Sequence, residues 1–525
     1  MTQESTRKIA QGARAVTVAV FISRILGLVR EQVLAGFFGA GLQMDAYVVA
    51  YRIPNLLRDL LAEGALASAF VKVFSEWHEK YGLKDTWLLA SRALSTIGLL
   101  VLTLVALGEI FAPYLVKLLA PGFSSFAGKV ELSTFLTRIM FPFLFLVSLS
   151  AVFGGMLNSL GTFFLPAISS ALFNLISVST GVLLYFVVPR FGLPAITGMA
   201  VGVVLGGIFQ AFIQWPKLRA LGFRFRFTPS ITDPGVREIF KLMAPSVIGL
   251  SAVQLNVFVN TYFASICGQG AVSWLAYAFR LMYVPLGLFG VALQVAILPV
   301  ASRQAAQGAL ENLKKTYISS LLMGSSLALP SAVGLIILAH PVVRLIFEHG
   351  NFTPVDTQNT ALALALFSVA LPAYALTKIT VPVFYALGRP QIPMYSSFLA
   401  VGINLSLVWS LVKVMSFKAV ALSTSLALTG QCLFLLFYLE LTLGPLPWRH
   451  LGRGLSRLAV ACLALGLLAY LVKHFLTSLQ GLWFGIVLFA GILACAVIYF
   501  ALVALLGPTE GLYLLESFLQ RRKKA

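Results

Sequence analysis

The chain has 525 residues, of which 59% are hydrophobic and only 11% are charged, and its mean hydropathy is +0.92. Soluble domains carry about 45–50% apolar residues, so this composition excludes a water-soluble globular protein. A net charge of +20 would suggest nucleic-acid binding in a soluble chain, but in a membrane protein it reports topology, and no nucleic-acid partner is expected. The four cysteines show no CxxC spacing, so neither a zinc site nor a disulfide framework is expected.

Apolar runs long enough to cross about 30 Å of hydrocarbon recur along the whole chain. They predict an all-α polytopic membrane protein with fourteen transmembrane helices, near residues 9–40, 43–78, 86–118, 130–157, 161–188, 191–216, 237–266, 271–303, 314–345, 355–387, 391–414, 417–441, 453–474 and 480–507. The first apolar stretch is too long for a signal peptide, so we expect it to be retained as the first helix.

Lysine and arginine are unevenly distributed between the connecting segments. The segments assigned to the cytoplasmic side hold 24 of them, those assigned to the opposite side hold 7, and a further 7 lie within the predicted spans. Because cytoplasmic loops are enriched in these residues, the distribution predicts that both termini are cytoplasmic.

Two sequence patterns occur twice, about 228 residues apart: Tyr51-Arg52-Ile53-Pro54 with Phe279-Arg280-Leu281 and Pro285, and Leu160-Gly161 and Pro166 with Leu387-Gly388 and Pro393. They predict an N-terminal lobe of six helices (1–227), a C-terminal lobe of six helices (228–445), and two extra helices with a basic tail (446–525). An even number of helices in each lobe places the pseudo-twofold axis along the membrane normal. This arrangement is typical of transporters that work by alternating access to a cavity between the lobes.

The basic residues within the predicted spans are Arg24, Arg30, Arg52, Arg58, Arg138, Arg280 and Lys378. Each costs about 2.5–3.5 kcal/mol in a bilayer, so we expect them to line a watery cavity or to pair with acids. The acids available in the first two helices are Glu31, Asp45, Asp59 and Glu63. Asp45 and Arg52 are seven residues apart on one helix face, so a local pair between them is possible. Any single arginine could instead form a structural ion pair or snorkel to the interface.

Arg280 and Lys378 differ from the other cations because their lobe is poor in acids. Between Lys241 and Leu439 the only acidic residues are Glu311, Glu348 and Asp356, all near predicted loops. We therefore expect an anion of the substrate to balance these two cations, and a phosphate group suits the fork of an arginine.

Several segments strongly resemble the MurJ/MviN family: Ser23-Arg24-Ile25-Leu26-Gly27-Leu28-Val29-Arg30-Glu31, Asp45-Ala46-Tyr47, Ile53-Pro54-Asn55-Leu56-Leu57-Arg58, Ala62-Glu63-Gly64-Ala65, Ala120-Pro121-Gly122-Phe123 and Val272-Ser273-Trp274. The resemblance covers essentially the whole chain. It implies a member of the multidrug/oligosaccharidyl-lipid/polysaccharide exporter superfamily in the bacterial cytoplasmic (inner) membrane. It further implies a lipid II flippase, which carries the undecaprenyl-pyrophosphate-linked peptidoglycan precursor from the cytoplasmic to the periplasmic leaflet.

The resemblance and the charge pattern together define the expected site. The substrate-binding residues are expected to be Arg24, Arg30, Arg52, Asn55, Arg58, Ser273, Arg280 and Lys378, and the gating or ion-pair residues Glu31, Asp45 and Glu63. Phe279 and Tyr283 stand where members of the family can carry acids, which argues against a strict Arg–acid gate in the eighth helix. We expect a transporter without enzymatic activity or cofactor, coupled to the membrane potential or to a monovalent cation. Its expected partners are lipid II, membrane lipids and proteins of cell-wall synthesis.

Three other functions agree with parts of the sequence pattern. A flippase for another polyprenyl-pyrophosphate-linked glycan, such as an O-antigen or capsule unit, would use the same cations and is the main alternative. A drug/cation antiporter would place acids opposite its cationic substrates, whereas the cavity expected here is basic. A membrane scaffold without transport activity would have no use for cations inside the membrane.

Overall fold

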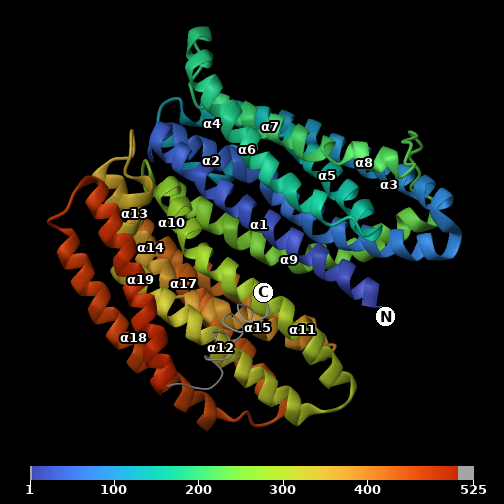
Figure 1. The fold of residues 1–525 in the computed structure, drawn as a ribbon. Coiled ribbons are helices and arrows are strands. Elements are labelled where there is room, and N and C mark those ends of the chain that lie inside the picture. The colour runs from blue at the N-terminus through green and yellow to red at the C-terminus, as the bar shows by residue number, and fades with distance from the viewer. Residues whose placement is uncertain (1–2, 507–525) are drawn as a thin grey trace. The chain divides into compact units, whose positions relative to one another are not determined.

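A computed structural model describes residues 3–506, apart from the side chains of residues 3–15, 17, 62, 63, 288, 289 and 291. Every regular element within that range is helical (Figure 1), which confirms the all-α fold. Contacts divide the chain into two compact units, one up to Ser273 and the other from Trp274 onward.

The first unit runs from blue to green in Figure 1. Its elements are α1 (Gln3–Phe38), α2 (Leu42–Leu57), the π-helix η1 (Arg58–Leu66), α3 (Ala67–Leu119), the short 3-10 helix η2 (Pro121–Ser125), α4 (Lys129–Met140), α5 (Pro142–Ser159), α6 (Phe164–Val187), the 3-10 helix η3 (Val188–Phe191), α7 (Thr197–Phe212), α8 (Trp215–Ala220) and α9 (Pro234–Ile266). Helix α6 packs against α1 and α7, α3 packs against α5 and α9, and α2 packs against α4.

The second unit runs from green to red. Its elements are α10 (Ala271–Pro285), which begins just before the boundary, the π-helix η4 (Leu286–Gly290), α11 (Val291–Ala306), α12 (Leu310–Ile337), α13 (Ala339–Phe347), α14 (Pro354–Ser368), α15 (Leu371–Ala386), α16 (Gln391–Met415), α17 (Phe417–Leu443), α18 (Trp448–Leu476) and α19 (Gly481–Leu506). Helix α12 packs against α15 and α18, and α18 lies beside α19. The Tyr499 hydroxyl of α19 donates to the backbone oxygen of Ser326 at 2.8 Å, which ties the terminal pair to α12.

The order of elements supports the internal repeat. In each half a helix containing a proline near its end is followed at once by a π-helix: α2 with Pro54 precedes η1, and α10 with Pro285 precedes η4. A proline has no N–H to donate to the carbonyl four residues earlier, which disturbs the helix at that point. π-Helical turns are rare and are frequent at functional sites.

Ten helices in the described chain are long and apolar enough to cross a membrane, or eleven if the pair α14 and α15, bent by 45°, forms one span. The run from Leu42 to Leu119 counts as one of them, although Gly82 interrupts it with φ 77° and ψ 175°. This interruption lies between the predicted helices 43–78 and 86–118. The total of fourteen spans stays a prediction.

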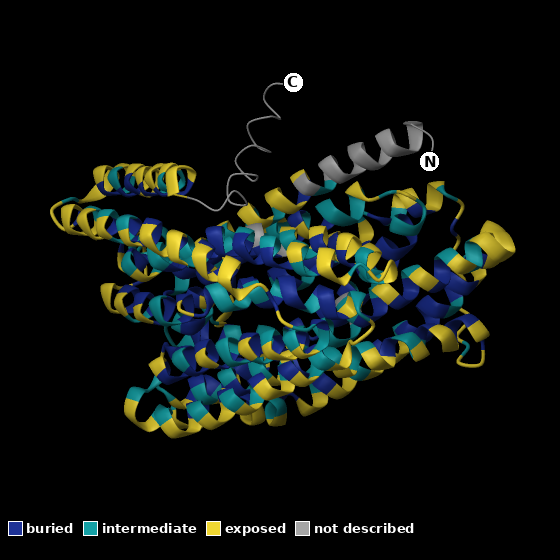
Figure 2. Cartoon of the chain, turned by 90° about the horizontal axis from the view of Figure 1, so that it is seen from below, coloured by how far each residue is buried: buried dark blue, intermediate teal, exposed yellow. Residues whose placement is uncertain are grey.

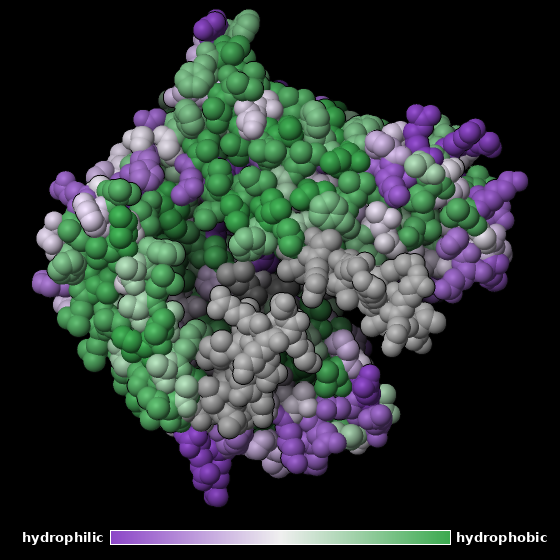
Figure 3. Space-filling model, in the orientation of Figure 1, coloured by the Kyte–Doolittle hydropathy of each residue, from purple (hydrophilic) through white to green (hydrophobic). Residues whose placement is uncertain are grey.

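Burial follows the pattern of membrane helices, with buried faces inside each unit and exposed apolar faces outside (Figure 2). The hydropathy of the visible face agrees, because hydrophobic residues cover the lengths of helices and hydrophilic residues gather around the bend of α3 and around α8 (Figure 3). Helix α9 packs against α3 and η1 within the first unit. The contact boundary at Ser273 therefore lies one helix beyond the lobe boundary expected from the repeat, at 227/228, which stays a prediction about sequence symmetry.

Candidate functional site

A fully buried ion pair organises the polar contacts of the first unit. The Lys129 Nζ of α4 lies 2.8 Å from the Asp45 Oδ2 of α2, and both side chains are 0% exposed. The same ammonium group lies over the rings of Phe123 and Phe126, 4.2 Å and 4.8 Å from their centroids. A buried pair of this kind is tolerated only when the remaining donors and acceptors are also satisfied.

The start of α10 satisfies the rest of the Asp45 carboxylate. Asp45 Oδ2 accepts from the backbone N–H of Gly270 at 2.7 Å, and Oδ1 accepts from the backbone N–H of Ser273 at 3.0 Å and from its hydroxyl at 2.6 Å. Helix N-termini offer unpaired N–H groups and favour negative charge, so this carboxylate is well placed. Ser273 is 0% exposed, and in this structure its hydroxyl serves Asp45.

These contacts change two sequence-based interpretations. Asp45 forms its ion pair with Lys129, not with Arg52 on its own helix; Arg52 instead donates to the Thr261 hydroxyl of α9. Lys129, which the charge distribution placed in an external segment, is a buried part of the site. No local sequence pattern links a lysine at the start of one helix to an aspartate far earlier in the chain, so sequence analysis missed it.

Gly270 is required at its position by its backbone geometry. Its φ is +90°, a region that costs L-residues roughly 1–2 kcal/mol, and its N–H points at Asp45. We expect Gly270→Ala to lower the free energy of unfolding by about 1–2 kcal/mol, measured by thermal unfolding in detergent. Gly334→Ala is the matched control, because Gly334 lies inside α12 with open space around it and alanine favours a helix. Equal effects of the two substitutions would contradict the role given to Gly270.

Arg30 of α1 is buried among aromatic rings. Its guanidinium carbon lies 5.6 Å from the centroid of Tyr51 and 5.9 Å from that of Phe173, and its Nη2 donates to Glu31 Oε1 at 3.2 Å. Among the described side chains its Nε–H finds no acceptor. The group is therefore held in place by ring contacts and one carboxylate while a donor stays available.

The other expected residues of the first unit lie on α1, α2 and η1. Arg24 is exposed, and the neighbouring Ser23 carbonyl accepts from Asn174 at 3.2 Å. Asn55 donates to the Tyr51 carbonyl at 2.8 Å, and its side-chain oxygen is buried without a donor in the described part of the chain. Arg58 pairs with the adjacent Asp59 at 2.8 Å, which is a local ion pair of the kind that any of these arginines could form. Glu63, an expected gating residue, falls outside the described side chains.

In the second unit, Arg280 of α10 is exposed and Lys378 of α15 is half-buried. The Lys378 ammonium lies 5.4 Å from the centroid of the Tyr374 ring. Tyr374 in turn contacts Tyr283 at 6.3 Å between centroids, and Tyr283 stacks with Phe279 at 6.1 Å. The two residues that stand in place of acids thus form an aromatic row from α10 to Lys378.

The three acidic residues between Lys241 and Leu439 all form contacts with residues other than Lys378. Glu311 pairs with Lys314 at 2.8 Å, and Glu348 pairs with Arg344 at 3.6 Å. Asp356 caps α14 and accepts from the indole of Trp274 at 2.8 Å. Of the side chains described, none provides an ion pair to Lys378, so the charge of this ammonium group is not balanced by a described carboxylate.

The long apolar helices define a polytopic membrane protein. The fold is similar to that of a multidrug resistance transporter of the MATE family in an inward-facing conformation. The match has a TM-score of 0.65 and covers 82% of this chain and 98% of that chain, at 15% identity. A lipid II flippase MurJ in an inward closed conformation matches with a TM-score of 0.77 at 26% identity, over 93% of this chain and 98% of that chain.

Sequence comparisons identify the family. The model of the family described as lipid II flippase MurJ matches residues 34–493. A probable lipid II flippase MurJ of Bdellovibrio bacteriovorus is 32% identical over 509 residues, 96% of each chain. The corresponding protein of Rickettsia prowazekii is 32% identical over 459 residues, 87% of this chain and 88% of its own. The chain belongs to the lipid II flippase MurJ family, as the resemblance over essentially the whole chain implied.

Proposed function

We propose that this protein translocates lipid II across the bacterial cytoplasmic membrane. The observation that carries the proposal is the half-buried ammonium group of Lys378, to which none of the described side chains provides an ion pair, in a chain whose relatives are named as lipid II flippases. The pyrophosphate of lipid II would supply the missing negative charge. A phosphate group accepts two parallel hydrogen bonds from a guanidinium, a geometry that a lysine cannot match.

The residues would divide the task of binding. Arg30, fixed between Tyr51 and Phe173 with a free N–H, is suited to hold a phosphate oxygen. Arg24 and Arg280, both exposed, are suited to reach a charged substrate. Asp45, expected to act in gating, holds the first turn of α10 in this structure, and breaking that contact would free the helix. Alternating access with both termini cytoplasmic remains part of the proposal.

The source of energy is also proposed. Moving net positive charge across the membrane yields about 2.3 kcal/mol per charge per 100 mV, so the cations of the site could couple transport to the membrane potential. A monovalent cation bound by backbone and amide oxygens is the other expected means of coupling. No cofactor is part of the proposed cycle.

Reconstitution tests the substrate. The full-length chain is incorporated into proteoliposomes with fluorescent lipid II or with an undecaprenyl-pyrophosphate-linked O-antigen unit, and the loss of accessibility to an external quencher or modifying reagent is followed. We expect lipid II to be moved faster than the O-antigen unit. Preferential movement of the O-antigen unit would assign the protein to the alternative class of flippase, and movement of neither would contradict the proposal.

A further inference from the structure

The segment that joins α8 to α9 is an extended chain fixed at both ends to the first unit. At one end Phe223 is 0% exposed and its ring contacts Trp87 and Trp215, with centroids 5.2 Å and 5.9 Å away. At the other end Asp233 caps α9 by accepting from the N–H of Gly235 at 3.0 Å, and it pairs with Arg92 of α3 at 2.5 Å.

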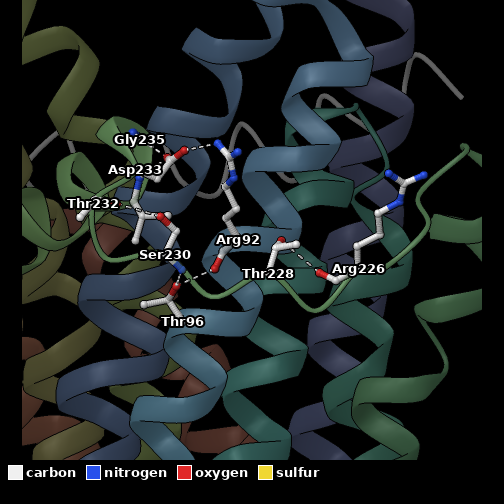
Figure 4. Close-up of polar contacts among 9 residues, drawn as sticks. Arg92, Thr96, Arg226, Thr228, Ser230, Thr232, Asp233 and Gly235 are labelled. Carbon is white, nitrogen blue, oxygen red and sulfur yellow. Dashed lines mark hydrogen bonds and ion pairs between the residues drawn. The ribbon is translucent and has the colours of Figure 1, made fainter.

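Between these ends, helix α3 holds the backbone of the segment. The N–H of Thr228 donates to the Ser95 hydroxyl at 3.1 Å, and the N–H of Ser230 donates to the Thr96 hydroxyl at 2.9 Å. Figure 4 shows the result: the chain lies along α3 with Arg92 directed at Asp233, while the Arg226 side chain points away from α3. The segment is therefore an ordered strap, which we define as residues 224–232.

The strap presents basic and apolar side chains in alternation. Arg224 and Arg226 are exposed, and so are Phe225, Phe227 and Ile231, which are 41%, 64% and 72% exposed. From Trp215 to Arg237 the sequence has a single acid, Asp233, which is 5% exposed and already paired. The exposed surface of the strap consequently carries uncompensated positive charge beside large apolar groups.

The position of the strap on α3 indicates what covers this surface. Arg92 is the last charged residue of α3 before an uncharged run that continues to Glu109, so hydrocarbon is expected to begin near Arg92. The strap contacts α3 at Ser95 and Thr96, and the adjoining Asp233 contacts Arg92, at this same level. Guanidinium groups there can reach phosphate headgroups while aromatic and aliphatic groups enter the acyl boundary.

We propose that the strap is a binding site for the headgroups of anionic phospholipids, which fixes the connection between the two repeats at the membrane surface. Arg224 and Arg226 bind the phosphates, and Phe225, Phe227 and Ile231 provide the apolar contact. Charge complementarity with the anionic cytoplasmic leaflet, on which the charge distribution places this segment, supports this occupant. The proposal does not depend on which glycolipid the protein transports.

Hydrogen–deuterium exchange of the full-length protein in nanodiscs tests this site. We expect the peptide containing the strap to take up deuterium more slowly when phosphatidylglycerol is added to phosphatidylcholine, and high salt to remove the difference. The double variant Arg224→Gln/Arg226→Gln should lose about 25-fold in apparent affinity for phosphatidylglycerol, roughly fivefold for each arginine. Thr228 and Ser230 should keep their protection in this variant, which shows that the strap still lies on α3.

Two controls separate the possible causes. Lys413→Gln/Lys418→Gln removes two exposed charges elsewhere and should leave the lipid response of the strap unchanged. Inorganic phosphate added to nanodiscs of phosphatidylcholine alone should give no protection, since the proposed ligand is a membrane lipid. Equal exchange in both bilayers, protection by free phosphate alone, or an unchanged response in the Arg224→Gln/Arg226→Gln variant would overturn the proposal.

Discussion

Lys129→Met should lower the free energy of unfolding by about 3–5 kcal/mol, because it leaves the Asp45 carboxylate buried without its counter-charge. The backbone N–H groups of Gly270 and Ser273 would still bind the carboxylate, but neither carries a full charge. The loss is measured as a shift of the unfolding transition in detergent. The double variant Asp45→Asn/Lys129→Met should recover part of the loss, since it removes both charges together.

The exposed pair Lys72 and Glu76 provides the matched control. These side chains are 56% and 53% exposed and 3.9 Å apart, so Lys72→Met should cost less than about 1 kcal/mol. If Lys129→Met were as mild as Lys72→Met, the buried pair would not organise the site. The charge argument would also be contradicted if the double variant lost more free energy of unfolding than Asp45→Asn and Lys129→Met lose together as single variants.

Arg30→Gln should reduce lipid II binding about 10- to 100-fold, the loss expected when a charge-assisted hydrogen bond of about 1.5–3 kcal/mol is removed. Arg30→Lys keeps the charge but lacks the planar fork that lies between Tyr51 and Phe173, so it should recover only part of the affinity. Binding of fluorescent lipid II to the purified variants measures both effects, and their unfolding transitions show whether the fold is intact.

Arg138→Gln is the control for loss of a cation within the predicted spans. Arg138 of α4 is exposed and donates to the Glu109 carbonyl of α3 at 3.1 Å, a contact that concerns helix packing. It should leave lipid II affinity within about twofold of the wild type, because rim charges and surface contacts contribute little to binding. Equal losses for Arg30→Gln and Arg138→Gln would show that net charge, not the position of Arg30, governs binding.

Much of the fold could be predicted because a bilayer restricts the options. Long apolar runs must become helices, so the all-α class follows from composition alone. The break at Gly82 and the disturbed helices at Pro54 and Pro285 were also within reach, since glycine and proline act through local geometry. The π-helical form of η1 and η4 could not be predicted from the sequence, because an extra residue in a helical turn depends on how neighbouring helices pack.

The site was less predictable because side-chain partners come from distant parts of the chain. The scarcity of acids near Arg280 and Lys378 is a property of the sequence, and the structure agrees that Glu311, Glu348 and Asp356 have other partners. The partners of Asp45, in contrast, could not be predicted from the sequence. A helix period suggested Arg52, whereas tertiary packing supplied Lys129 and the start of α10.

Lipid II translocation by this protein is tested by the periplasmic exposure of labelled lipid II in cells depleted of their own flippase. We expect the wild-type chain to restore exposure and Arg280→Ala, inserted to the same level, not to restore it. Rescue by both forms would retain the substrate but remove Arg280 from the site. No exposure with a well-expressed, correctly inserted wild-type chain would contradict lipid II translocation by this protein.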